Sequence, residues 1–352
     1  SDGIAVACGA NHDGQCTFPR LDDGMMYTQV SAGAYHSILL RSDGVAVAYG
    51  MNNHGQCHIP PLEDGMTYIQ VSAGASHTVL LRSDGIAVAC GTPAHGRNIP
   101  SLDDTMTYTQ VSAGQSHTVL LTSDGIAVAC GENTHGQCNI PCLEDGMTYT
   151  QVSAGGFHTV LLRSDGVAVA CGLSLHGPCH FPPLEDGMRY TQVSAGANFT
   201  VLLRSDGIAV ACGLNVQGQC SIPRLDDGMT YTQVSAGRFH TVLLRSDGGA
   251  VACGMNNHGQ CNMLTPDPGT WYIADELSGD IVVQLDFACQ DDALLLTCFD
   301  VAGEAVLCLR TDPGELAWAM HQHLARDLKL PLQRLRVVLP DGHLLASLCR
   351  AA

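Results

Sequence analysis

Aromatic residues, positive charge and long apolar runs are all scarce in this chain. Phe, Trp and Tyr make up only 5% of the 352 residues, whereas 39 residues are Gly, and this composition favours many short strands and tight turns over a helical bundle. The net charge of −18 argues against nucleic acid as a partner and leaves basic proteins or cations as candidates. Because no apolar run reaches the length of about 18 residues that a membrane helix needs, we expect no membrane span.

The sequence also lacks the motifs that would indicate an enzyme. It contains no glycine-rich phosphate-binding loop, no nucleophile elbow and no kinase signature. We therefore expect a protein with no catalytic residues, no cofactor and no bound metal. No targeting segment is visible, but Ser1 lies in the middle of a repeating unit, so a processed N-terminus stays open. The cytoplasm or nucleus is the expected compartment, with an organelle as the alternative.

What the sequence does contain is a repeat with a period of 41 residues and one unit of 40. Within a unit, "TYTQVSAG" predicts a first strand (A), "HTVLLR" a second (B), "IAVACG" a third (C) and "QCHIP" a short fourth strand (D). The "SDG" between B and C is typical of a tight hairpin turn. Four antiparallel strands in each of several successive units predict a β-propeller, and a solenoid is the alternative.

One unit, "VSAGAYHSILLRSDGVAVAYGMNNHGQC", resembles the repeat of the regulator of chromosome condensation family. That repeat has a Gly after strand A, a His at the start of strand B and a Gly-Asn-x-x-Gly-Gln segment. The resemblance covers about residues 1–263, and it implies a seven-bladed propeller. The units here are shorter than those of the founding member of the family.

The seventh blade is expected to come from both ends of the chain. Six units are complete, and residues 1–20 supply one further C–D half. A degenerate hairpin at about residues 270–287 would supply the missing A–B half, and residues 4–8 should then pair with about residues 280–287. This closure would hide sheet edges that are otherwise exposed, and the propeller would span residues 1–290.

A different pattern begins at about Ala293. "LLLTCFDVAGEAVLCLR" predicts a hairpin, "DPGELAWAMHQHLARDLKL" an amphipathic helix and "LPLQRLRVVLPDGHLL" a strand and a turn. This order resembles the ubiquitin-like fold, so residues 291–352 are expected to form a small α+β (β-grasp) domain. That domain would be incomplete, because the chain has no room for the last long strand. The expected fold class is therefore mainly β, with a seven-bladed β-propeller followed by a ubiquitin-like domain.

Histidines, His–Cys pairs and acidic pairs recur in the units and could carry chemistry. The His that opens strand B would form a ring of ligands or bases, but Phe199 takes its place in one unit, which favours a structural role. The "HGQC" pairs, such as His54 and Cys57, could bind zinc, but each blade supplies only one pair. Pairs such as Glu63 and Asp64 could act as acid and base or bind Ca²⁺, but all six pairs are alike, which favours solvated turns.

The 17 cysteines mostly follow the repeat in two sets, one in "AVACG" and one in "GQC" or "GPC". The sets lie across a predicted hairpin, close enough to suggest cross-strand disulfides. Tyr49 replaces one such cysteine and Arg97 replaces another, so free buried thiols are the favoured interpretation.

Propeller geometry predicts two distinct faces. The B–C turns and D–A connections share one face, which collects most carboxylates and could receive a basic protein. The A–B and C–D loops share the other face, where near-identical units differ most and where large side chains suited to interfaces occur. Neutral drift is the alternative explanation for these differences. The candidate partner-binding residues are Tyr35, Asn52, Phe157, Asn198, Arg238 and Phe239.

We therefore expect a non-enzymatic scaffold that binds a protein, alone or as a subunit of a larger complex. An adaptor or recognition component in ubiquitin ligation is the second hypothesis. Guanine-nucleotide exchange on a small GTPase, the activity of the family's founding member, is the third, although the even spacing of the units leaves no room for an inserted wedge loop. The ultraviolet-B photoreceptor of the family depends on a cluster of Trp, and only Trp271 and Trp318 are present here.

Overall fold

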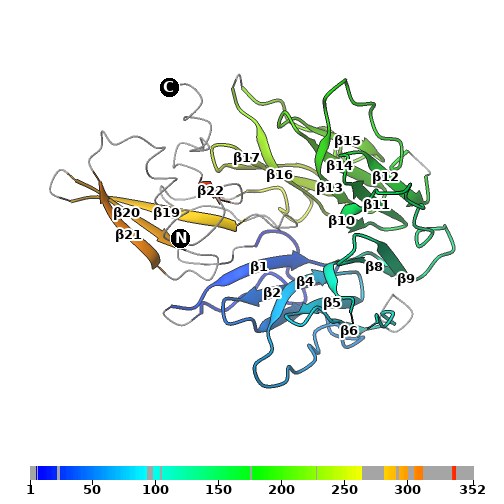
Figure 1. Cartoon of the computed structure of the whole chain (residues 1–352), viewed down its shortest axis with the longest axis horizontal. Helices are drawn as coiled ribbons and strands as arrows, with labels where there is room; N and C mark the ends of the chain where they lie inside the picture. Colours follow the sequence, from blue (N-terminus) through cyan, green and yellow to red (C-terminus); the bar gives the residue numbers. More distant parts are fainter. Residues whose placement is uncertain are drawn as a thin grey trace.

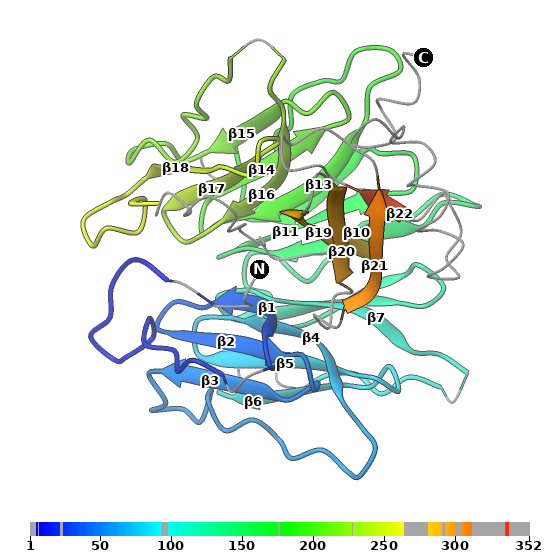
Figure 2. The same cartoon turned by 90° about the vertical axis from the view of Figure 1, so that its left-hand side faces the viewer.

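The computed structural model describes residues 5, 7–21, 24–92, 98–103, 105–174, 177–226 and 228–263, and the backbone of four later strands. Six three-stranded antiparallel sheets follow one another along the chain and form the repeated blades of a β-propeller (Figure 1). We number these sheets blades one to six. The first and last blades lie on either side of the N-terminal segment, as the blue and yellow-green strands of Figure 2 show.

Each blade contains strands A, B and C in chain order. The A strands are β1 (Tyr27–Ala32), β4 (Tyr68–Ala73), β7 (Tyr108–Ala113), β10 (Tyr149–Ala154), β13 (Tyr190–Ala195) and β16 (Tyr231–Ala236). The B strands are β2 (His36–Arg41), β5 (His77–Arg82), β8 (His117–Thr122), β11 (His158–Arg163), β14 (Phe199–Arg204) and β17 (His240–Arg245). The C strands are β3 (Ala46–Gly50), β6 (Ala87–Gly91), β9 (Ala127–Gly131), β12 (Ala168–Gly172), β15 (Ala209–Gly213) and β18 (Ala250–Gly254).

The B–C hairpin forms where the "SDG" signal predicts it. In blade one the Arg41 amide donates to the Val45 carbonyl over 2.9 Å, and Gly44 takes a φ of 77° that L side chains rarely adopt. The Asp43 carboxylate accepts a hydrogen bond from the Val45 amide over 3.1 Å, and this side-chain bond stabilises the turn in addition to the backbone bond. The turn is thus determined by three consecutive residues and needs no help from the rest of the fold.

The predicted fourth strand is not a strand. The segment from residue 51 to residue 60 has turns at residues 53–57 and no strand, because side chains take up the backbone groups that a strand would use. Asn52 Oδ1 accepts from the Cys57 amide over 2.9 Å, and Gln56 Oε1 accepts from the His54 amide over 3.0 Å. The Gln56 side chain is fully buried. We call this segment the C–D loop; it is held by its own side chains rather than by strand pairing.

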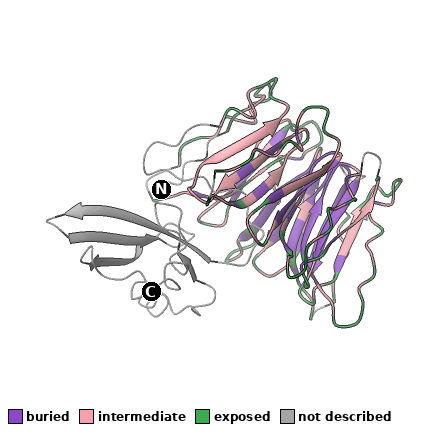
Figure 3. Cartoon of the chain, turned by 90° about the horizontal axis from the view of Figure 1, so that it is seen from above, coloured by how far each residue is buried: buried purple, intermediate pink, exposed green. Residues whose placement is uncertain are grey.

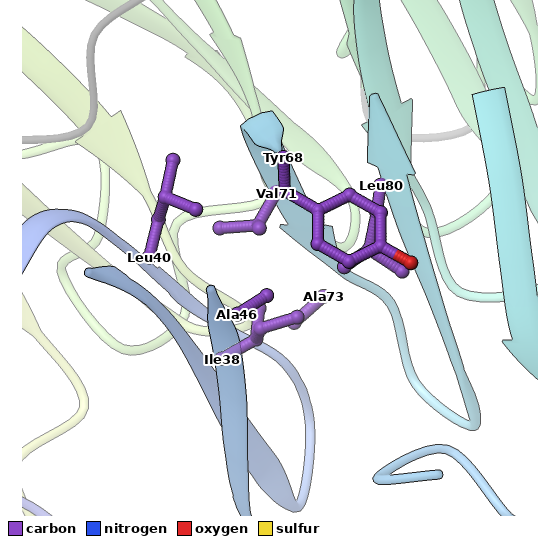
Figure 4. Close-up of a cluster of buried hydrophobic side chains, with 7 residues drawn as sticks. All are labelled: Ile38, Leu40, Ala46, Tyr68, Val71, Ala73 and Leu80. Carbon is purple, nitrogen blue, oxygen red and sulfur yellow. The ribbon is translucent and has the colours of Figure 1, made fainter. Parts of the chain in front are cut away.

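The hydrophobic core lies between blades rather than within them. Ile38, Leu40 and Ala46 of blade one pack against four residues of blade two, which are Tyr68, Val71, Ala73 and Leu80. Figure 4 shows the two groups facing each other. Buried residues are accordingly concentrated in the strands (Figure 3). Because each blade completes the core of its neighbour, a single unit cannot bury its apolar side chains alone.

The residues before blade one fill the C–D position of a further blade. The Ser37 hydroxyl donates to the Gln15 carbonyl over 2.8 Å, as the Thr78 hydroxyl does to the Gln56 carbonyl. On the other side, the Cys8 thiol lies 3.6 Å from the Gln260 carbonyl of blade six. Residues 8–20 therefore lie between blades six and one, as the sequence analysis expects. A complete seventh sheet is not described, and residues 264–280 lie outside the described residues.

The later strands form a separate sheet of order β21-β20-β19-β22. Its members are β19 (Ile281–Gln290), β20 (Ala293–Phe299), β21 (Ala305–Thr311) and β22 (Leu335–Val337), with β22 parallel to β19. The hairpin predicted from Ala293 is confirmed as β20 and β21. The helix expected at residues 312–330 lies outside the described residues.

The position of β19 differs from the sequence analysis, which places residues 280–287 in blade seven. Gln284 to Gln290 of β19 pair with β20, and only residues 291 and 292 separate the two strands. Closing so short a loop costs less entropy than pairing with the other end of the chain. Ile4 and Val6, part of the predicted partner strand, lie outside the described residues. The ubiquitin-like interpretation is not supported, because β19, which precedes the predicted domain, lies between β20 and β22.

Candidate protein-binding face

The A–B and C–D loops share one face of the propeller, as predicted. In blade one the Met51 amide, at the start of the C–D loop, donates to the Tyr35 carbonyl in the A–B loop over 2.9 Å. The equivalent bond occurs in the other five blades, joining Thr92 to Ser76, Glu132 to Ser116, Leu173 to Phe157, Leu214 to Asn198 and Met255 to Phe239. The positions that vary most between units are therefore held on a fixed backbone.

Neighbouring A–B loops are also bonded to each other. The Ala75 amide donates to the Gly114 carbonyl over 3.3 Å, and the Ala34 amide to the Gly74 carbonyl over 3.2 Å. A Cβ added at Gly74 would lie 2.5 Å from the Gly114 carbonyl oxygen, so close contact requires glycine here. Bonds of this kind join the A–B loops of blades one to five. The six A–B loops, each held to the C–D loop of its own blade, form a band from which the variable side chains project.

Three of the candidate binding residues come together on this band. The Arg238 guanidinium donates to the Tyr35 hydroxyl over 3.3 Å, and it lies 5.1 Å from the centre of the Phe239 ring. Tyr35 belongs to blade one, whereas Arg238 and Phe239 belong to blade six. Tyr35 is 44% exposed and Arg238 is exposed. We call these residues the Tyr35–Arg238–Phe239 cluster; it presents an exposed tyrosine ring, a half-buried phenylalanine ring and a cation.

The other three candidates lie elsewhere on the band. Phe157 of blade four packs edge-on against His135 of the C–D loop of blade three, with ring centres 5.3 Å apart. Asn198 is half-buried in blade five, and its carbonyl accepts the Leu214 amide bond already described. Asn52 has a structural role, because its side-chain oxygen holds the Cys57 amide. The structure therefore separates these residues from the Tyr35–Arg238–Phe239 cluster.

The recurring histidines are structural, as their replacement by Phe199 predicts. His36 Nε2 lies 2.8 Å from the hydroxyl of Thr78 in the next blade. That hydroxyl donates its proton to the Gln56 carbonyl, so it accepts the hydrogen on Nε2 and defines the tautomer of the ring. Burial lowers the pKa of His36, His117 and His158 to about 4, so these rings are neutral near pH 7.

Cysteine positions agree with free thiols rather than disulfides or zinc ligands. Cysteines of both sets are free thiols, as the following six show: Cys57, Cys138, Cys171, Cys179, Cys212 and Cys220. Burial raises the pKa of Cys130 to about 11 and the pKa of Cys171 and Cys212 to about 12. Among the described residues, no group of three or more His, Cys, Asp or Glu side chains could hold a metal ion. The same residues include no helix with the length and apolar character of a membrane span.

The opposite face is less uniformly acidic than the sequence suggests. Ser83 at the B–C turn donates its amide to the Thr67 carbonyl over 2.8 Å, which confirms that B–C turns and D–A connections share this face. Five "SDG" aspartates are ion-paired with an arginine two residues earlier: Arg41–Asp43, Arg82–Asp84, Arg163–Asp165, Arg204–Asp206 and Arg245–Asp247. The carboxylates that stay exposed and unneutralised by these pairs include Glu63, Asp64, Glu144 and Asp145.

This opposite face also carries a set of exposed apolar side chains that the repeat pattern did not single out. A Val or Ile directly follows "SDG" in five blades and is between 41% and 53% exposed: Val45, Ile86, Ile126, Val167 and Ile208. The sequence does contain a sign of this exposure, because the Val or Ile comes directly after the turn and before the buried part of strand C. An apolar residue at this place is also expected in an ordinary strand, so it does not stand out.

Comparison with known proteins identifies the fold and the family. Among solved structures, Prp20p from Saccharomyces cerevisiae is similar at 18% identity and a TM-score of 0.58, over 65% of this chain and 72% of that one. Human WBSCR16 is similar at 20% identity and a TM-score of 0.57, over 67% and 80%. The CRINKLY WD40 ectodomain of the Arabidopsis thaliana receptor kinase ACR4 is similar at 20% identity and a TM-score of 0.53, over 67% and 82%. No curated protein sequence matches this chain.

The sequence matches the family model described as "Regulator of chromosome condensation (RCC1) repeat" six times. The matched residues are 27–56, 68–97, 108–137, 149–177, 190–219 and 231–260. Each match begins at the first residue of an A strand and extends past the end of the C strand of the same blade. The matches together cover about half of the chain and include all six described blades. This chain therefore belongs to the RCC1-repeat family of propeller proteins.

Proposed function

We propose that the chain is a non-enzymatic scaffold that binds a protein partner through the A–B and C–D face. The observation that carries this proposal is the Tyr35–Arg238–Phe239 cluster. Tyr and Arg are the residue types that most often dominate the energy of protein interfaces. Here they project from A–B loops whose backbone is hydrogen-bonded to the C–D loop of the same blade, so binding would cost little ordering of the backbone.

The similar structures support a protein as the class of partner. Prp20p is described by its binding to Gsp1p and histones, and in another structure it is bound to Kap60. The net charge of −18 disfavours nucleic acid for the chain studied here. A basic partner could in addition approach the exposed carboxylates of the opposite face, such as Glu144 and Asp145.

The test compares two double variants that change opposite faces. Tyr35→Ala with Phe239→Ala removes the aromatic rings of the cluster. Ile86→Ala with Ile126→Ala removes two exposed side chains of similar apolar character from the other face. Affinity purification followed by mass spectrometry should show partners that bind the wild-type chain and the Ile86/Ile126 variant but not the Tyr35/Phe239 variant. Retention of every partner by the Tyr35/Phe239 variant would overturn the proposal.

Two narrower functions have their own readouts. Recruitment to a ubiquitin ligase would be identified by ligase or proteasome subunits among the captured proteins. Guanine-nucleotide exchange is favoured only by the fold shared with Prp20p. In the described blades the A–B and B–C connections are short turns of similar length, so none of them is a long inserted loop that could reach into a GTPase. Measured nucleotide release from a Ran-like GTPase would decide this second function.

A further inference from the structure

The aspartate of the "SDG" turn binds a guanidinium in five of the six described blades. In blade two the Arg82 guanidinium donates to the Asp84 carboxylate over 2.6 Å, and in blade four Arg163 donates to Asp165 over 2.7 Å. The same ion pair forms in blades one, five and six. The arginine is always the last residue of strand B. The molecule itself thus shows, five times, which side chain this turn accepts.

Blade three has the aspartate but not the arginine. Thr122 ends strand B there, and its hydroxyl donates to Asp124 Oδ1 over 2.5 Å. The Ile126 amide donates to the same oxygen over 3.4 Å. Asp124 is exposed, and among the ion pairs of the described residues none includes it. A carboxylate has two oxygens and accepts several hydrogen bonds, so Asp124 can bind a cation from outside the chain.

A second carboxylate belongs to the same cation position. In blade six the hydrogen bond to Asp247 raises the pKa of Arg245, and so does the charge of Asp226 in the preceding D–A connection. Asp103 stands at the equivalent place before blade three, and it is exposed. A guanidinium bound at the turn of blade three would therefore interact with this carboxylate as well as with that of the turn.

An exposed apolar side chain lies directly beside this position. Ile126, the first residue after the turn, is 53% exposed. The D–A connection into blade four packs against the same turn, because the Tyr149 amide donates to the Gly125 carbonyl over 2.8 Å. That connection carries two further exposed carboxylates, Glu144 and Asp145. The charge and the apolar surface are thus complementary to a segment that combines a cation with an apolar side chain.

We propose that the turn of blade three is a docking site for a protein segment in which an arginine stands next to an apolar residue. We call Asp103, Asp124 and Ile126 the blade-three site. The incoming guanidinium takes the position that Arg163 occupies in blade four, and its apolar neighbour covers Ile126. The site lies on the face opposite the Tyr35–Arg238–Phe239 cluster, so it goes beyond the proposed function, and either can fail without the other.

The test uses the full chain and a short fluorescein-labelled peptide of alternating Arg and Leu. Fluorescence anisotropy should show saturable binding that weakens as salt is added. Thr122→Arg restores the ion pair of the other blades and should weaken binding about fivefold, as expected for one exposed ion pair. Val216→Arg adds the same charge at a residue of a C–D loop that is 74% exposed, and it should bind as the wild type does. Wild-type affinity in Thr122→Arg, or equal weakening in Val216→Arg, would overturn the proposal.

A matched pair of isoleucines locates the peptide. Ile86 follows the turn of blade two and is 51% exposed, so it differs from Ile126 chiefly in having Arg82 in its own blade. In methyl NMR spectra the peptide should shift the Ile126 signal and leave Ile86 unchanged. Arg82→Thr should make the Ile86 signal shift as well. Equal shifts of both signals in the wild-type chain would mean that the peptide recognises any exposed isoleucine, which contradicts the proposal.

Two controls separate loss of the site from loss of folding. Thr122→Arg should unfold at the same urea concentration as the wild type, since five blades accommodate an arginine at this place. Asp124→Asn removes the charge but keeps a side-chain oxygen that can accept from the Ile126 amide. This variant should weaken peptide binding about as much as Thr122→Arg does. Unchanged binding in Asp124→Asn would overturn the proposal even if Thr122→Arg were destabilised.

Discussion

The Arg238 guanidinium donates a hydrogen bond to the Tyr35 hydroxyl over 3.3 Å, although 203 residues separate them in the chain. The bond joins the last described blade to the first at the edge formed by the A–B loops. Neither residue is distinctive in its own unit; each is a variable position between "SAG" and strand B. Their meeting depends on the closing of the blades around a common axis.

The first prediction concerns the energy of this contact. Because Tyr35 is 44% exposed, the bond is expected to contribute only about 0.2–1 kcal/mol to stability. A double-mutant cycle with Tyr35→Phe and Arg238→Ala, measured by urea unfolding, should give a coupling energy in this range. A coupling energy well above it would show that the contact holds the ring together, which would assign the cluster a structural role instead of a binding role.

The second prediction concerns the buried histidines. His117 is fully buried, and its Nε2 lies 2.9 Å from the Thr159 hydroxyl. His117→Ala should lower the free energy of unfolding by about 2–4 kcal/mol, because it leaves a cavity and removes a buried bond. His117→Phe should cost less, because Phe199 is fully buried at the same position of blade five and leaves the Thr241 hydroxyl bonded to the Gln219 carbonyl.

Guanidinium unfolding of both variants checks this prediction. Equal loss of stability in His117→Phe and His117→Ala would contradict it, since the ring nitrogen rather than the ring volume would then matter. Phe199→His is the reciprocal variant and should be tolerated in the same way.

The third prediction is a loss of stability in mild acid. Burial lowers the pKa of His36, His117 and His158 from 6.5 to about 4 in the folded state. The unfolded chain therefore binds protons first as the pH falls below about 6.5. Stability is complete above that pH and declines as the pH falls toward 4, by up to about 1.4 kcal/mol per pH unit for each histidine.

Urea unfolding at a series of pH values between 7.5 and 4.5 measures this slope. His117→Phe removes one titrating ring and should make the slope shallower by about 1.4 kcal/mol per pH unit near pH 5. An unchanged slope in this variant would mean that other groups carry the acid sensitivity.

The fourth prediction concerns the reactivity of the thiols. Burial raises the pKa of Cys130, Cys171 and Cys212 to about 11 or 12, so their thiolate fraction at pH 7.5 is very small. Cys142 is exposed. Alkylation with iodoacetamide followed by peptide mass spectrometry should modify Cys142 long before these three. In Cys142→Ser, rapid labelling of Cys130, Cys171 or Cys212 would contradict the raised pKa of these thiols.

Much of the blade could be read from local sequence. The A, B and C strands follow from short apolar patterns separated by "SDG", whose turn is complete within Arg41 to Val45. The structural role of the histidines follows from Phe199 in the equivalent place. The C–D loop was harder to predict, because "QCHIP" has strand-like composition and only the side-chain bonds of Asn52 and Gln56 turn it into a loop.

The repeat pattern is enough to predict the number and order of the described units, because the turns and the strand alternation of each unit depend on neighbouring residues. Which distant segments meet follows only from the folded blades. The tertiary structure placed β19 beside β20 rather than in the ring, and it brought Tyr35 to Arg238. The physical reason is that these contacts depend on the rotation from each blade to the next, added over all the blades around the axis. No short sequence pattern specifies that total rotation, whereas turns and strand alternation depend on neighbouring residues.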